Sequence, residues 1–272
     1  MGKAVRLDRF LADSGAGTRT EVKKLIQKGM VQVNGEKAKK PELKIDPETD
    51  VVEFGGEHIG ARAEFVYYLL HKPAGYVSAT EDTREKTVLD LVPKDGRRNL
   101  FPVGRLDKDT EGLLLITDDG QLAHRLLSPK KHVDKTYFAV TEGKVVPEDI
   151  EKIRLGVDIG DEEPTLPGKL EILRTWKEDA DRKNVEGESG AVMANSNAAG
   201  HKADPEGSIW CSEILLTIHE GRFHQVKRMM EAVGKKVIYL KRISMGSLTL
   251  PDDLPKGQVR KLTLDELAAL KC

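Results

Sequence analysis

The chain has 272 residues, which is long enough for one sizeable domain and a smaller one. Its 44 Lys and Arg nearly balance 45 Asp and Glu, and no apolar run approaches the roughly 20 residues that span a bilayer. The first ten residues lack the apolar core of a secretory signal, so we expect a cytoplasmic protein with no membrane partner. Two cysteines, Cys211 and Cys272, provide neither a disulfide framework nor a metal cluster, and we expect no bound metal.

The charges are distributed unevenly along the chain. Residues 1–45 hold eleven Lys and Arg against five Asp and Glu, a local charge of +6. Residues 221–245 hold seven against one, again +6, whereas residues 178–207 hold three against seven, or −4. Two basic segments in a neutral chain indicate phosphate-binding surfaces, with acidic surface elsewhere.

The first 56 residues predict a small domain of short helices and strands. Apolar residues recur at helical spacing over residues 4–13. A capping box, Thr18-x-x-Glu21, begins a second helix with several lysines on its polar side. Residues 30–35 then alternate like a strand that leads into an Asn-Gly turn.

Two patterns in this region, R-L-D-x-F-L and T-R-T-E-x-x-x-L-I-x-x-G-x-V-x-V-N-G, resemble the small RNA-binding domain of the ribosomal protein S-four type, the αL motif. The resemblance implies that the second helix and the turn after it contact RNA. The implied contacts are basic or polar: Arg6, Arg9, Arg19, Thr20, Lys23, Lys24, Lys28 and Asn34. Phosphate contacts of this kind give affinity without sequence choice, so the domain would recruit RNA rather than select a site.

A glycine-rich, polar segment follows, and we place a linker at residues 57–64 and a large domain at residues 65–272. The large domain begins with an aromatic and β-branched strand at 65–70, and a turn at 71–76 leads into a second strand at 77–79. The remaining predicted helices are 87–91, 121–127, 147–154 and 264–270, and the remaining predicted strands are 113–116, 137–140, 169–176, 209–218, 237–243 and 247–250.

Residues 178–207, between two strands that could pair, are polar and acidic with almost no large apolar side chains. Such a segment does not bury enough surface to order itself, and we expect a mobile, solvated insertion.

The stretch from Phe101 to Gly120 holds several acidic residues before and after a short apolar run, and it permits two interpretations. The first is a calcium loop, because Asp107, Asp109, Glu111, Gly112 and Asp118 fall at positions 1, 3, 5, 6 and 12 of the EF-hand pattern. The chemistry is poor, since position 12 calls for a Glu that binds the ion through both oxygens, and Asp118 is one methylene shorter. The six residues before the loop include a proline and a glycine, which do not favour the helix that an EF-hand requires.

The second interpretation is a reactive aspartate beside a guanidinium. Arg105 lies two residues before Asp107 and would keep this carboxylate ionised, the form that acts as a nucleophile or general base. From the spacing alone, a structural Arg–Asp pair that fixes the loop is an equal alternative.

The run G-R-L-D-x-x-T-x-G-L-L at residues 104–114 resembles the signature of pseudouridine synthases. Residues 101–140 as a whole are similar to the branch that modifies ribosomal RNA, the RsuA/RluB/RluE/RluF family. Residues 71–76 resemble the N-K-P-x-G element of these enzymes, with His71 in place of the usual Asn, and residues 221–229 resemble the motif G-R-x-H-Q-V-K-R-M.

The resemblance covers nearly the whole chain apart from residues 178–207. It implies an α+β fold, with the αL-motif domain followed by a catalytic domain that has a mixed, mostly antiparallel sheet and a central cleft. The implied reaction is the isomerisation of a specific uridine in ribosomal RNA to pseudouridine, which needs no cofactor or metal.

The resemblance also implies the residues of the site. Asp107 is the implied nucleophile or base, and Lys227 would pair with its carboxylate. Tyr137 would pack against the flipped target base, and Arg105 would fill the space that the base leaves. Further RNA contacts are implied at Lys72, Arg222, His224, Gln225 and Arg228.

Relatives in this branch act on different sites, so small-subunit ribosomal RNA, large-subunit ribosomal RNA and transfer RNA stay open as substrates, in that order. We expect a monomer that acts on ribosomal RNA or on a ribosomal subunit assembly intermediate. A ribosome-assembly factor that binds RNA without catalysis is the alternative, supported by the basic segments. The joint presence of Asp107, Tyr137 and Lys227 favours the enzyme.

Overall fold

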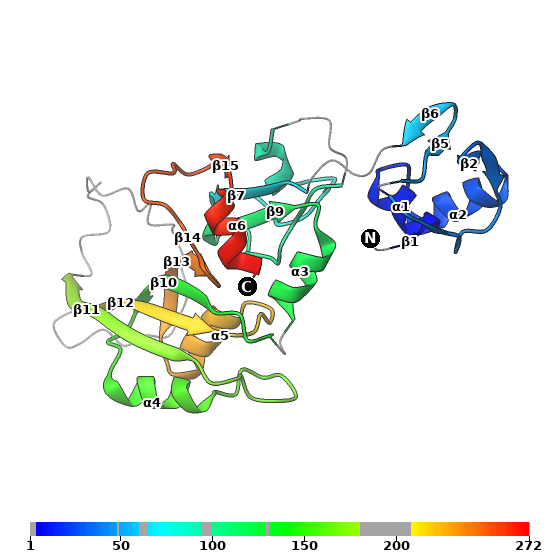
Figure 1. Cartoon of the computed structure of the whole chain (residues 1–272). Helices are drawn as coiled ribbons and strands as arrows, with labels where there is room; N and C mark the ends of the chain where they lie inside the picture. Colours follow the sequence, from blue (N-terminus) through cyan, green and yellow to red (C-terminus); the bar gives the residue numbers. More distant parts are fainter. Residues whose placement is uncertain are drawn as a thin grey trace. The chain divides into compact units, whose positions relative to one another are not determined.

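A computed structural model describes residues 4–47, 49–59, 65–93, 99–128, 131–179 and 208–271 (Figure 1). The chain divides into two compact units. The small unit comprises Met1–Val66 with Lys94–Asn99, and the large unit comprises Tyr67–Pro93 with Leu100–Cys272. Within the described ranges, no helix combines the length and the apolar character needed to cross a membrane.

The small unit packs two helices on short strands. Its elements are β1 (Val5–Arg6), α1 (Leu7–Asp13), α2 (Arg19–Gln27), β2 (Val31–Val33), β3 (Glu36–Ala38), β4 (Lys44–Ile45), β5 (Val52–Phe54) and β6 (Glu57–Ile59). The strands form a four-stranded sheet in the order β3-β2-β5-β6 and a separate β1–β4 pair. Leu7, Leu11, Val22, Ile26 and Val31 join the helices and the sheet in one buried core.

Two local signals of the small unit are confirmed. The hydroxyl of Thr18 accepts a hydrogen bond from the Glu21 amide, and the Glu21 carboxylate accepts one from the Thr18 amide at 2.8 Å, which completes the capping box that begins α2. Asn34 and Gly35 adopt φ angles of 51° and 82° in the turn between β2 and β3. This is the left-handed geometry that Asn-Gly favours in a hairpin.

The predicted linker was wrong at its first three residues, because Glu57–Ile59 form β6, antiparallel to β5. Gly55 and Gly56 adopt φ angles of 64° and 84°, so these glycines make the hairpin turn between the two strands instead of a hinge. Residues 60–64, the rest of the expected linker, lie outside the described residues.

The large unit is built on one mixed sheet. Its elements are β7 (Tyr67–Lys72), η1 (Val88–Leu91), β8 (Phe101–Pro102), β9 (Glu111–Thr117), α3 (Gly120–Leu127), β10 (Lys135–Glu142), α4 (Pro147–Leu155), β11 (Lys169–Asp179), β12 (Ser208–Ile218), α5 (Gln225–Ala232), β13 (Lys236–Met245), β14 (Leu248–Thr249), β15 (Val259–Lys261) and α6 (Leu264–Lys271). The strand order is β11-β12-β10-β13-β9-β7-β15, with β14 beside β13 and β8 beside β9. Among the described pairings only β13 with β9 is parallel, so the α+β fold with a mixed, mostly antiparallel sheet is confirmed.

The expected pairing of residues 169–176 with residues 209–218 is also confirmed, in the long antiparallel pair β11–β12 (Figure 1). Helix α4 packs against β11, and α5 packs against β13.

The expected strand at 77–79 does not form, since Val77 makes only an isolated bridge to Thr87. Glu178 and Asp179 end strand β11, and the rest of the acidic insertion predicted at 178–207 lies outside the described residues.

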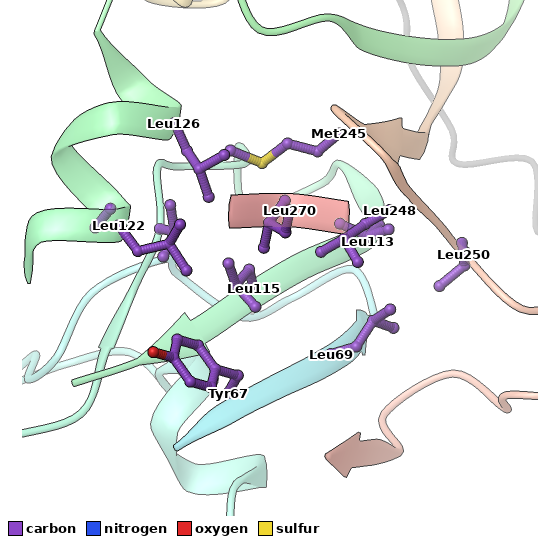
Figure 2. Packing of buried hydrophobic residues seen from close by; sticks show 12 residues of the cluster. Tyr67, Leu69, Leu113, Leu115, Leu122, Leu126, Met245, Leu248, Leu250 and Leu270 are labelled. Atoms are coloured by element: carbon purple, nitrogen blue, oxygen red, sulfur yellow. The ribbon is translucent and has the colours of Figure 1, made fainter. Parts of the chain in front are cut away.

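A leucine-rich core fixes β9 in place. Leu113 and Leu115 on β9 point into a cluster with Leu122 from α3, Met245 from β13 and Leu270 from α6 (Figure 2). All five side chains are buried, as expected for apolar residues that pack together in a core. The acidic loop before β9 is therefore anchored to a strand that lies in the buried core of the large unit.

Candidate active site

The loop that carries Asp107 is held by backbone contacts on both sides. Ser78 donates from its hydroxyl to the Leu106 carbonyl at 2.8 Å and accepts from the Leu106 amide at 3.0 Å. The Gly75 amide donates to the Lys108 carbonyl at 2.7 Å. The Thr110 amide donates to the Asp107 carbonyl at 3.0 Å, so the chain turns at Asp107 before it enters β9.

Lys72 holds the same loop from inside the protein. Its side chain is fully buried at the end of β7, and its ammonium donates to the carbonyls of Asp107, Lys108 and Thr110 at 3.0, 3.3 and 2.7 Å, as well as to Pro73. Burial lowers the pKa of Lys72 to about 8, although nearby carboxylates act in the opposite direction. These backbone acceptors occupy the ammonium of Lys72 within the protein, and its predicted contact with RNA stays a prediction.

Lys227 joins the acidic loop to α5. Its ammonium lies 2.7 and 2.8 Å from the two carboxylate oxygens of Asp109 and 3.5 Å from Oδ2 of Asp107. Burial acts to raise the pKa of Asp109, but the hydrogen bonds and the charge of Lys227 outweigh it and hold this pKa below its usual value. The structure thus brings Lys227 to Asp107, 120 residues away in sequence, and shows that the lysine is shared with a second carboxylate.

His224 lies on the other side of the Asp107 carboxylate, with Nε2 3.6 Å from Oδ1. It is the residue before α5 and adopts φ 49° and ψ 33°, a left-handed backbone conformation. Together with the neighbouring loops it borders a shallow depression of about 420 Å³, which falls in the size range of ligand sites. The residues that line it are Ala74, Gly75, Asp107, Lys108, Asp109, His224 and Lys227.

Arg105 does not pair with Asp107, which corrects the expectation drawn from their spacing. Arg105 is exposed, Leu106 beside it is buried, and no ion pair within 4.0 Å joins the described side chains of Arg105 and Asp107. Among the described residues, the basic side chains with a nitrogen within 4.0 Å of the Asp107 carboxylate are Lys227 and His224.

Tyr137 is placed by the sheet on β10, directly opposite Arg242 of β13. It is 8 % exposed and does not belong to the lining of the depression around Asp107. Its assigned role against the target base stays a prediction.

The segment that precedes and begins α5 is largely occupied with internal contacts. Arg222 donates to the Pro164 carbonyl at 2.9 Å, and Arg228 donates to the Ile159 carbonyl at 3.0 Å. Gln225 is buried, and its amide donates to a neighbouring glutamate at 2.9 Å. The predicted RNA contact of Gln225 stays a prediction. Arg222 and Arg228 fix the loop at 159–164 to α5, and an RNA contact by either stays a prediction.

The basic residues predicted to bind RNA in the small unit lie on its surface. Arg19, Thr20, Lys23 and Lys24 are exposed on α2, and Lys28 is exposed at its C-terminal end. Two others are engaged within the unit: Arg6 pairs with Asp8 at 2.8 Å, and the Asn34 side chain bonds to Asp50 and to the Val51 amide. Arg9 pairs with Asp13 at 3.4 Å.

The carboxylates of the EF-hand pattern do not converge on one point. Asp109 is held by Lys227, whereas Glu111 accepts from the Tyr239 hydroxyl at 2.7 Å and pairs with Lys256 at 2.8 Å. These partners lie on α5, on β13 and in the loop before β15, and the chain continues from Glu111 as strand β9. The structure therefore favours the interpretation of a reactive aspartate over a calcium loop.

Sequence reasoning missed Asp109 as the main partner of Lys227 and Lys72 as the support of the loop. Asp109 was visible only through the EF-hand spacing. Lys72 was marked only through the N-K-P-x-G resemblance, which gave no sign of its backbone partners.

Comparisons with known proteins agree with this site. The family model described as RNA pseudouridylate synthase matches residues 66–232, and the S4 domain model matches residues 5–52. A Bacillus subtilis (strain 168) protein named as an uncharacterized RNA pseudouridine synthase, YtzG, is 44 % identical over 267 residues, 98 % of each chain. Ribosomal small subunit pseudouridine synthase A of Vibrio parahaemolyticus is 38 % identical over 97 % of this chain and 98 % of its own.

A crystal structure of a pseudouridylate synthase matches the fold with a TM-score of 0.62 and 34 % identity, over 98 % of this chain and 99 % of that chain. The sequence and structural matches extend across both units and include the Asp107 loop and α5. The chain therefore belongs to the RNA pseudouridylate synthase family and is a pseudouridine synthase with an S4 domain in its N-terminal part.

Proposed function

We propose that this enzyme isomerises one uridine of small-subunit ribosomal RNA to pseudouridine and that Asp107 is its reactive group. Relatives named ribosomal small subunit pseudouridine synthase A are aligned with this chain over almost their whole length. The observation that carries the residue assignment is the Asp107 carboxylate itself. It is 26 % exposed at the depression, has Lys227 and His224 on its two sides, and sits on a loop whose backbone is bound by Lys72.

The proposed reaction exchanges one bond for another within the nucleotide. The bond from N1 of uracil to C1′ of ribose breaks, the ring turns, and a bond from C5 to C1′ forms. The proton on C5 leaves and N1 gains a proton, so the reaction is balanced without an oxidant or a reductant. A fixed carboxylate suits this chemistry because it can add to an electron-poor carbon or remove a proton. Lys227 and His224 would orient that carboxylate toward the bound nucleotide.

The target uridine must leave its stack before Asp107 can reach it, since the reacting atoms of a stacked nucleotide are covered. Arg105 is exposed, and we propose that its guanidinium occupies the space from which the base is drawn. We propose that Tyr137 packs against the extruded ring, which requires the nucleotide to reach a residue that is buried in the free protein.

The small unit would recruit the RNA. Arg19, Lys23 and Lys24 project from the exposed side of α2 and carry no acidic partner within 4.0 Å among the described residues. Free cations on one helix face suit contacts with phosphates, which depend strongly on salt and little on sequence. Site choice would then rest with the large unit, and we propose that the protein acts as a monomer.

The experiment that tests this function maps pseudouridine in ribosomal RNA by carbodiimide-dependent stops of reverse transcription. Protein-free ribosomal RNA and assembled subunits are each treated with the wild-type enzyme and with Asp107→Asn. We expect one new stop in small-subunit RNA with the wild type and none with the variant. A stop in large-subunit RNA alone would overturn the substrate assignment, and RNA binding without any stop would indicate a non-catalytic assembly factor.

A further inference from the structure

Phe223 is an exposed aromatic residue that the fold does not use. Among the aromatic residues that the structure describes it is the most exposed, at 74 %, whereas Phe10, Tyr67, Tyr68 and Tyr137 are buried. It lies in the loop immediately before α5, between a basic residue and His224. Exposure alone does not assign a role to a single apolar side chain, but the contacts of this ring connect it to the site.

The ring of Phe223 is stacked on the ring of His224. Their centroids are 3.8 Å apart and the ring planes differ by 16°. His224 in turn places Nε2 3.6 Å from the Asp107 carboxylate. The two rings and the carboxylate therefore form a continuous row, in which one face of Phe223 is covered by His224.

The backbone around the two rings is held in a strained form. The φ of 49° at His224 lies in the left-handed region, which costs free energy for most residues other than glycine and asparagine. Arg228 holds it from both sides, since its guanidinium donates to the Phe223 carbonyl at 3.1 Å and its amide donates to the His224 carbonyl at 3.0 Å. Contacts that maintain strain at this place, beside a reactive carboxylate, indicate that the orientation of the two rings serves the site.

We propose that Phe223 and His224 form a stacking platform for the base of a nucleotide next to the target uridine. The proposal rests on the function proposed above for Asp107. A nucleobase laid on the open face of Phe223 would be separated from the Asp107 carboxylate by only the two rings, which suits a neighbour of the reacting nucleotide. Aromatic side chains that carry bases in this way accept any sequence, because every base has a π-face.

The surroundings favour RNA over a protein as the occupant. The residues nearest to Phe223 in the chain are Arg222, His224 and Gln225, and Lys108 and Lys227 border the same depression. The chain neighbours of Phe223 are polar or cationic, and the ring that it contacts is the imidazole of His224. An exposed ring in a basic segment of the chain suits a nucleotide strand, whose bases stack on rings and whose phosphates bind cations.

The test uses the full chain and a short RNA that carries the mapped uridine. Single-turnover rates are measured against enzyme concentration for the wild type, Phe223→Ala, Phe223→Leu, Phe223→Tyr and Phe223→Trp. A matched control is Leu155→Ala, an exposed apolar residue on α4 that is 70 % exposed. We expect Phe223→Ala and Phe223→Leu to raise the half-saturating concentration by about tenfold with little change in the maximal rate, and the aromatic variants and the control to match the wild type.

A second arm identifies the nucleotide. An abasic residue is placed on either side of the uridine, and we expect one position to weaken binding to the wild type about tenfold but to leave Phe223→Ala unaffected. If Phe223→Leu has the same half-saturating concentration as the wild type, the proposal of a stacking platform is wrong. A defect of Phe223→Ala on assembled subunits alone, with none on free RNA, would overturn it in favour of a protein contact.

Direct binding of the same RNA, measured by fluorescence anisotropy, separates the two proposals. Absence of pseudouridine with the wild type would contradict the proposed function. A weaker affinity of Phe223→Ala in that same binding assay would still support the stacking contact, and equal affinities would contradict it.

Discussion

Lys227 and Asp109 form a two-oxygen ion pair, with the ammonium 2.7 Å from Oδ1 and 2.8 Å from Oδ2. The same ammonium is 3.5 Å from the Asp107 carboxylate. One lysine from α5 therefore serves two carboxylates of one loop, of which Asp107 is the less exposed. Substitutions of Lys227 and of the aspartates can therefore show which of the two carboxylates is the reactive one.

We expect Lys227→Met to lower the rate of pseudouridine formation roughly 10²-fold, because it removes the cation that orients the reactive carboxylate. We expect Asp109→Asn to lower the rate less than about tenfold, since Lys227 can still pair with Asp107. Single-turnover rates at saturating enzyme measure both effects. If Asp109→Asn lowers the rate more than Lys227→Met does, the reactive group is Asp109 and the present assignment is wrong.

Lys72→Met tests the support beneath the loop. The change removes a buried ammonium and takes the Lys72 donor from the Thr110 carbonyl, which costs about 1–3 kcal/mol where water does not reach the acceptor, whereas the Asp107 carbonyl keeps its bond from the Thr110 amide. We expect a lower midpoint of thermal unfolding, measured by circular dichroism, together with slower catalysis. Lys86→Met, at an exposed position of the same unit, should behave like the wild type. Unchanged stability of Lys72→Met would show that the buried ammonium does not support the loop.

Gly112 joins the acidic loop to the sheet at a point where no side chain fits. Its φ is 107°, and a Cβ atom there would overlap the carbonyl oxygen of Arg242 and lie 2.7 Å from its nitrogen. We expect Gly112→Ala to destabilise the protein by more than about 3 kcal/mol in urea unfolding, because the backbone of β13 cannot move aside cheaply. Gly120→Ala is the control, since Gly120 has open space around it and an ordinary φ. Equal stabilities of the two variants would contradict the close approach of β9 and β13.

The last helix, α6, is predicted to be sensitive to acid through Glu266. Hydrogen bonds from Arg260 and from the Thr263 amide lower the pKa of Glu266 from 4.5 to about 2. Because the folded pKa is the lower one, the stabilisation is complete above about pH 4.5 and is lost as the pH falls through about 2. The difference in unfolding temperature between the wild type and Glu266→Gln should therefore narrow over this range. For the control Glu171→Gln, at an exposed strand position, we expect the difference in unfolding temperature from the wild type to stay constant over the same pH range. A constant difference for Glu266→Gln would refute the prediction.

Local signals in the sequence predicted the elements well wherever neighbouring residues decide the structure. The capping box of Thr18 and Glu21 and the turn at Asn34 and Gly35 depend on contacts within a few residues, and both form as expected. The glycines at 55 and 56 were misjudged because a flexible pair serves equally as a hinge or as a hairpin turn.

The site itself depends on contacts that sequence spacing does not reveal. The described side chains of Arg105 and Asp107 are two residues apart and form no ion pair within 4.0 Å, whereas Asp107 and Lys227 are 120 residues apart and approach to 3.5 Å. Only the resemblance to a known family connected the second pair before the structure was known. Lys72 could not be placed from its type, since a lysine is usually exposed and its backbone partners leave no trace in the sequence.

The most direct test of the central claim follows the hydrogen that the proposed reaction must release. RNA labelled with tritium at C5 of uridine is incubated with the wild type, with Asp107→Asn and with Asp109→Asn as the matched control from the same loop. Formation of the C5 to C1′ bond expels the label into water. We predict release by the wild type and by Asp109→Asn and none above background by Asp107→Asn, whereas release by Asp107→Asn at the wild-type rate would contradict the assignment of Asp107 as the reactive group.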